Sequence, residues 1–144
     1  MKQIIHAVHI HAAPSDVFQA LTTAEGLRQW WTTQVQAEER EGGVISFTFA
    51  GDFHPRMKQT RLDLDARVEW LCVAGHSNWQ DNTFSFVLGE RKGETLLMFS
   101  QGYARELSDE VYGTYNFNWG YYLNSLKLLC EKGAGVPFKP PSSA

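Results

Sequence analysis

A long amphipathic helix near the C-terminus constrains the fold of this chain more than any other feature. Residues 108–132 place their large apolar side chains at intervals of three and four, which predicts one helix with a single apolar face. Ser108 is a good N-cap, Asp109 and Glu110 suit the positive end of the helix dipole, and Gly133 suits the helix end. At about 1.5 Å per residue such a helix spans about 36 Å, enough to cross a whole sheet.

The apolar face of this helix changes character along its length. Its N-terminal half is aromatic and its C-terminal half is aliphatic, in the order Val111, Tyr112, Tyr115, Trp119, Tyr122, Leu123, Leu126 and Cys130. Bulky rings leave irregular spaces between them, so two interpretations stay open. The rings either fill a packed core or wall a pocket.

Length and charge limit what the chain can be. Its 144 residues suit one domain, which we expect over residues 1–134, followed by a mobile tail over 135–144 that carries three prolines. A net charge of -3 gives no basic field for nucleic acid or an anionic membrane. No apolar run approaches the roughly 18 residues of a membrane span, and residues 1–14 lack the apolar core of a secretion signal.

The two cysteines point to a reducing compartment. Cys72 and Cys130 are far apart and follow no metal-binding or redox spacing. We therefore expect two free thiols and a cytoplasmic protein.

The first third of the chain predicts one strand and two short helices. Residues 2–11 alternate, with His6 on the apolar face and with His9 and His11 on the opposite face. Pro14 fits the first turn of a helix that ends near residue 21. Thr22 and Glu25 form a capping box that would open the second helix.

After the second short helix, the spacing of the hydrophobic residues changes from a period of 3.6 residues to a period of 2 residues. Strands are predicted over residues 35–38, 44–50, 82–90 and 94–102, and a long alternating stretch over 58–73 should break into two near 63–66. In that stretch we expect one shared face, made of Leu62, Leu64, Ala66, Val68, Trp70 and Cys72. One strand, two short helices, about six antiparallel strands and a long helix indicate an α+β fold.

Several motifs in this order resemble a known family. Residues 10–22 read I-H-A-A-P-S-D-V-F-Q-A-L-T, and residues 27–31 end in a tryptophan pair. Further matches are the Gly42-Gly43 pair, Trp79 ahead of T-F-S-F-V-L, G-E-T at residues 93–95, and the last-helix spacing of Trp119, Leu123 and Leu126. The chain resembles the START-like (SRPBCC) superfamily, in the branch of homologues of the activator of the 90-kDa heat-shock protein's ATPase.

This resemblance implies a helix-grip fold, a curved antiparallel sheet of six to seven strands wrapped around the C-terminal helix. It also implies binding or transformation of apolar small molecules, or a co-chaperone role. The sequence departs from the family pattern at Gln101, where relatives often carry a histidine or similar polar residue. It departs again at Asn118-Trp119-Gly120, where the glycine usually comes before the tryptophan.

Residues that could carry chemistry are few. His9 and His11, with His54 or His76, could hold a metal, but two ligands without a defined third make no site, so we expect no metal and no cofactor. Acid or base candidates for a polyketide cyclase or aromatase-type enzyme are His6, Asp52, Glu106 and the tyrosine hydroxyls. Gln101 has the parity of the inward residues of its strand, and a buried amide needs a partner.

The sequence therefore predicts a binding module without a dedicated catalytic site. Its ligand would be a small apolar or aromatic molecule held between the sheet and the last helix. The alternatives are the cyclase-type enzyme and an interaction domain with a chaperone or a second copy of the chain as its partner. The expected ligand-binding residues are Trp31, Phe47, Phe49, Trp70, Trp79, Phe84, Phe86, Phe99, Gln101, Tyr115, Trp119 and Tyr122.

Overall fold

A curved antiparallel sheet of seven strands organises the computed structural model, which describes residues 2–141. The strand order is β1-β7-β6-β5-β4-β3-β2, and every neighbouring pair is antiparallel. The strands are β1 (Gln3–Ile10), β2 (Val35–Ala37), β3 (Val44–Phe47), β4 (Arg56–Asp63), β5 (Arg67–Ala74), β6 (Thr83–Arg91) and β7 (Glu94–Gly102).

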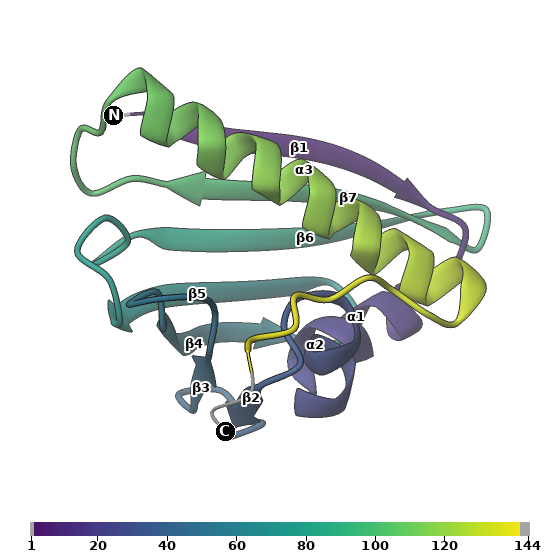
Figure 1. The fold of residues 1–144 in the computed structure, drawn as a ribbon. Coiled ribbons are helices and arrows are strands. Elements are labelled where there is room, and N and C mark those ends of the chain that lie inside the picture. Colours follow the sequence, from purple (N-terminus) through teal and green to yellow (C-terminus); the bar gives the residue numbers. More distant parts are fainter. Residues whose placement is uncertain (1, 142–144) are drawn as a thin grey trace.

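Helices cover one face of this sheet. The long helix α3 (Asp109–Lys132) runs along β1 and β7 toward the two short helices α1 (Pro14–Thr22) and α2 (Ala24–Trp30), which close one end (Figure 1). This arrangement is the predicted α+β helix-grip fold. No helix within residues 2–141 is long and apolar enough to cross a membrane.

Capping residues fix the helix ends. The Ser108 hydroxyl accepts a hydrogen bond from the Val111 amide at 3.2 Å, and Gly133 ends α3 in the left-handed conformation at φ 86°, both as predicted. The capping box at Thr22 was wrong, because Thr23 is the N-cap of α2 and accepts from the Gly26 amide at 3.0 Å. Thr22 instead belongs to α1, where its hydroxyl donates to the Phe18 carbonyl at 2.7 Å.

The break between β4 and β5 lies where the sequence predicted it, but the shared face does not extend through it. Leu64 sits in the turn and is 76% exposed, next to Asp65 at a positive φ of 58°. A register shift between Gln59 and Arg61 reverses the side-chain parity within β4, so Met57 and Gln59 are the buried residues there. The expected inward positions of Leu64 and Ala66 were wrong, because both residues lie in the turn between β4 and β5 and are exposed.

The third strand is shorter than predicted. It ends at Phe47, and residues 48–55 form a loop that returns to β4. The loop is held by hydrogen bonds from the Phe47 amide to the Pro55 carbonyl at 3.0 Å and from the Phe49 amide to the Phe53 carbonyl at 3.1 Å. This loop carries two further aromatic rings toward α3.

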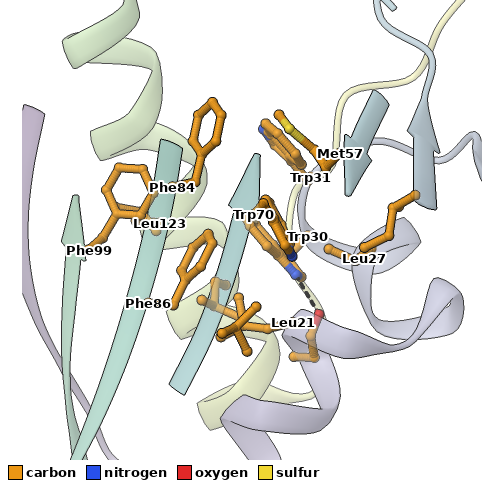
Figure 2. Packing of buried hydrophobic residues seen from close by; sticks show 14 of the residues in the cluster. Leu21, Leu27, Trp30, Trp31, Met57, Trp70, Phe84, Phe86, Phe99 and Leu123 are labelled. Carbon is orange, nitrogen blue, oxygen red and sulfur yellow. Dashed lines mark hydrogen bonds between the residues drawn. The ribbon is translucent and has the colours of Figure 1, made fainter. Parts of the chain in front are cut away.

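The core between helices and sheet is unusually aromatic. Phe84, Phe86 and Phe99 gather beside Leu123 of α3 (Figure 2). The indole N–H of Trp30 donates to the Ala20 carbonyl at 2.8 Å, the dashed line in Figure 2, and so joins α2 to α1. Because buried indole N–H groups need acceptors, this bond fixes how the two short helices meet.

Hydrogen bonds join the segment after α3 to the rest of the domain. The Val136 amide donates to the buried Ser125 hydroxyl at 2.7 Å. The Phe138 amide donates to the Trp31 carbonyl at 2.8 Å, and its carbonyl accepts from the Thr33 amide at 2.9 Å. Residues 135–138 are thus fastened to α3 and to the segment after α2, while residues 142–144 of the predicted tail lie outside the described residues.

Candidate functional site

A cavity of about 300 Å³ lies between α3 and the loops at one end of the sheet. It collects residues from five separate parts of the chain: the end of α2, the β3–β4 loop, the β5–β6 loop, α3 and the C-terminal segment. The lining residues are Trp31, Phe49, Ala50, Phe53, Trp79, Tyr115, Asn118, Trp119, Tyr122 and Phe138.

Trp31 connects the short helices to one side of the cavity. It follows α2 directly as the C-cap residue, and its ring contacts Phe47 at a centroid distance of 4.5 Å and Phe49 at 5.1 Å, both edge-on. Edge-to-face pairs of this kind add about 0.5–1.5 kcal/mol each beyond their burial. Trp31 therefore ties the short helices to the strand and loop that form one side of the cavity.

Three tryptophan rings of the cavity wall lie with their planes roughly parallel. Trp79 and Trp119 are nearly parallel, with 8° between their planes and 6.0 Å between centroids. Trp31 lies 5.1 Å from Trp119 at 30° and 6.3 Å from Trp79 at 23°. This produces flat aromatic surfaces, which suit stacking with another ring.

The polar groups of the wall are neutral. The Tyr115 hydroxyl accepts a hydrogen bond from the Asn78 side-chain amide at 3.1 Å, and its own proton stays available for donation. Asn118 adds an exposed side-chain amide. Burial, with Tyr121 nearby, raises the pKa of the Tyr122 phenol, which therefore keeps its proton at neutral pH.

A layer of buried polar atoms lies behind the aromatic wall. Trp119 donates its indole N–H to Gln101 Oε1 at 2.8 Å, so the inward amide predicted from the sequence does have a partner. The buried donors without a hydrogen-bond partner among the described residues include Gln101 Nε2, Trp79 Nε1 and the Tyr103 hydroxyl. Burial raises the pKa of Tyr103 far above its ordinary value, partly offset by the neighbouring Trp79 indole.

The structure divides the twelve predicted site residues into two groups. Those that border the cavity are Trp31, Phe49, Trp79, Tyr115, Trp119 and Tyr122. Those that pack behind it are Phe47, Trp70, Phe84, Phe86, Phe99 and Gln101, all at most 1% exposed. The second group points inward as predicted, but Trp119, which borders the cavity, covers three of its rings and lies 4.2 Å from Phe99.

Four lining residues were not predicted from the sequence: Ala50, Phe53, Asn118 and Phe138. Three of them lie in loops or in the C-terminal segment, where no periodicity tells which way a side chain points. The only signal in the sequence was that Phe53 and Phe138 are aromatic residues in otherwise polar segments. Such rings usually pack against an apolar surface.

Of the predicted acid and base candidates, the Tyr115 and Tyr122 hydroxyls border the cavity, while His6, Asp52 and Glu106 are not among the lining residues. His6 pairs its Nε2 with the Asn116 side chain at 2.9 Å, the Asp52 side chain is 95% exposed, and Glu106 is exposed. His9 is exposed and His11 meets Glu94, so both face solvent as expected. Residues 2–141 hold no cluster of three or more histidine, cysteine or acidic side chains that could bind a metal.

The two thiols are both free. Burial raises the pKa of Cys72, and it raises the pKa of Cys130 to about 11. Both side chains therefore stay protonated at neutral pH, which makes them poor nucleophiles.

Comparisons with known proteins agree with this architecture. The sequence profile of the family described as Activator of Hsp90 ATPase homolog 1-like protein matches residues 11–131. The solution structure of the Aha1 dimer from Colwellia psychrerythraea is 32% identical, over 94% of this chain and 100% of that chain, with a TM-score of 0.85.

More distant structures share the fold. CalU16 from Micromonospora echinospora is 19% identical over 93% of this chain and 76% of that one, with a TM-score of 0.73. A conserved protein from Enterococcus faecalis, EF2215, is 23% identical over 94% of this chain and 74% of that one, also with a TM-score of 0.73. No curated protein sequence matches significantly. The profile match and the Colwellia relative together show that this chain belongs to the Activator of Hsp90 ATPase homolog 1-like family.

Proposed function

We propose that the protein binds a small, uncharged apolar or aromatic molecule in the cavity between α3 and the sheet. The observation that carries this proposal is the lining itself, in which all ten residues are uncharged and eight are aromatic. Cavities of about 300 Å³ lie at the small end of ligand pockets, so the ligand should contain few rings.

The arrangement of rings favours a flat ligand. The parallel faces of Trp79 and Trp119 supply stacking area, while Tyr115, Tyr122 and Asn118 supply hydrogen bonds that set orientation. A charged ligand would lose its hydration without gaining an opposite charge, which costs several kcal/mol. We therefore propose a neutral ligand with one or two polar atoms.

Reversible binding is favoured over cyclase-type catalysis. Acid–base catalysis needs a group whose pKa lies near the working pH, and the cavity offers phenols and an amide. The raised pKa of Tyr122 moves its phenol further from that range. As part of the same proposal we place the protein in the cytoplasm, where the free thiols of Cys72 and Cys130 stay reduced.

A titration with N-phenyl-1-naphthylamine, an uncharged fluorescent probe, tests this proposal. Asn118 is exposed at the cavity, so Asn118→Trp should block the cavity without disturbing the core, and it should weaken probe binding by at least about tenfold. Asn124→Trp is the matched control, because Asn124 is also exposed on α3 but does not line the cavity. It should bind the probe as the wild type does.

Two results would count against the proposal. One is a wild type with no saturable binding of the probe. The other is equal affinity in the Asn118→Trp and Asn124→Trp variants, which would place the probe elsewhere.

A second candidate function is protein association. The family description names activation of the Hsp90 ATPase, and the Colwellia relative was solved as a dimer. We infer that this chain also associates with itself, with a chaperone ATPase as the alternative partner. Sedimentation of the purified chain over a concentration series tests the first, and ATP turnover by Hsp90 with and without the chain tests the second.

A further inference from the structure

The side of α3 that points away from the sheet carries large aromatic side chains in solvent. Phe117 is 76% exposed and Tyr121 is 50% exposed. The two lie one turn apart, and Gly113 lies one turn before Phe117, so the three share one side of the helix. We call this surface, made of Gly113, Phe117 and Tyr121, the Phe117 face.

The Phe117 face lies in an uncharged stretch of helix. Glu110 and Lys127 are the nearest charged residues of α3, and residues 111–126 between them contain none. The exposed side of a helix ordinarily carries charged side chains, whereas the centres of protein interfaces are enriched in aromatic residues and depleted in Lys and Glu. The composition of this exposed side is thus typical of an interface.

The face is also self-complementary. Gly113 is exposed and a Cβ placed there would meet no atom within 4 Å, so the missing side chain leaves open space on the helix surface, which we call the hollow at Gly113. If two copies of α3 cross antiparallel about a two-fold axis at Phe117, Gly113 lies opposite Tyr121 of the partner subunit. Each copy then supplies one ring and one hollow, which is the requirement for an isologous two-fold interface.

We propose that the Phe117 face binds a second copy of this chain through an antiparallel α3–α3 contact. Antiparallel helix dipoles attract, and the uncharged stretch brings no like charges together at the crossing. The proposal rests on the self-association inferred above and assigns its surface. A contact made by one helix per subunit falls below about 1,200 Å² of buried surface, so the dimer should be weak and concentration-dependent.

Sedimentation velocity from about 5 µM to about 500 µM measures this association. The wild type should shift from monomer to dimer across this range. Phe117→Lys puts a charge at the two-fold axis, and Gly113→Leu fills the hollow that receives Tyr121. Both should weaken the dimer by at least about tenfold. Gly113→Leu also raises helix propensity, so its effect cannot come from unfolding of α3.

Leu64→Lys is the matched control. Leu64 is as exposed as Phe117, at 76%, but lies in the β4–β5 turn, so this variant should dimerise as the wild type does. A direct test of register uses Phe117→Cys in a Cys130→Ser background. Mild oxidation should give a covalent dimer with Phe117→Cys and none with Leu64→Cys.

The possible outcomes distinguish an error in the proposed surface from an error in the proposed self-association. A wild type that stays monomeric at the highest concentration would overturn both. A wild-type dimer that Phe117→Lys and Gly113→Leu leave unchanged would overturn only the Phe117 face and retain self-association.

Discussion

The indole N–H of Trp119 donates a hydrogen bond to Gln101 Oε1 at 2.8 Å, and the two side chains are 2% and 0% exposed. This bond joins the middle of α3 to the end of β7. It also shows how one aromatic residue serves two purposes. Trp119 is a buried residue bonded to the sheet, and it also borders the cavity.

Replacing Gln101 by leucine should leave the Trp119 N–H buried without an acceptor. We expect a loss of about 1–3 kcal/mol in the free energy of unfolding, measured by urea denaturation. Adding Trp119→Phe removes the orphaned donor, so the double variant should lose less than the sum of the two single losses. Additive losses would show that the hydrogen bond contributes nothing of its own.

Trp119→Ala should destabilise the protein by about 3–5 kcal/mol, the usual loss when a large buried aromatic site is emptied. The reason is its burial against Phe99 and Phe86 on the strands. Thermal and urea unfolding measure this loss. A loss below about 1 kcal/mol would mean that the ring is already hydrated in the native state.

The C-terminal segment should matter more for binding than for stability. Phe138→Ala removes one side of the cavity and should weaken probe binding by about tenfold, with only about 1 kcal/mol lost in stability. Gly135→Ala should have the same effect without changing the lining. A Cβ there would lie 2.5 Å from the Gln29 carbonyl oxygen and displace the segment. Val136→Ala, at an exposed neighbouring position, should bind the probe normally.

Protonation of Glu131 should lower the free energy of unfolding in acid. Its carboxylate accepts hydrogen bonds at 2.7 Å from both the His11 amide and the Lys127 ammonium, and these lower its pKa in the folded protein. A lowered folded-state pKa stabilises the fold fully above the unfolded pKa of about 4.5, and this contribution disappears as pH falls through the folded value.

The matching variant is Glu131→Gln. It should lose about 1–2 kcal/mol at pH 7 and differ less from the wild type at pH 3, with urea unfolding at both pH values as the measurement. An equal difference at the two pH values would show that ionisation of Glu131 does not stabilise the fold.

Much of the fold follows from local patterns. The alternation in β1, β6 and β7 and the long stripe of α3 each identify their element, because one face of each is buried. The β6–β7 hairpin follows from Lys92 and Gly93, whose φ angles of 55° and 82° suit a tight two-residue turn.

The cavity was less predictable. The alternation of side chains along a strand shows which of them point inward, but it does not show how far each one lies from α3. Phe84, Phe86 and Phe99 point inward and are covered by Trp119. Phe53 and Phe138 reach the cavity from loops, where backbone hydrogen bonds rather than periodicity set their direction. The exposure of Leu64 has a similar origin, since the turn at Asp65 interrupts an alternation that continues through it in the sequence. The register shift after Gln59, which buries Met57 and Gln59, likewise has no signal in the hydrophobic pattern.

A crystal structure of the protein with N-phenyl-1-naphthylamine tests the central claim most directly. We predict that a ring of the probe lies between α3 and the β3–β4 loop, stacked on Trp79 or Trp119 and within hydrogen-bond reach of Tyr115, Tyr122 or Asn118. Probe density confined to the outer surface of the molecule, with Phe53 and Phe138 closed over an empty cavity, would contradict the claim.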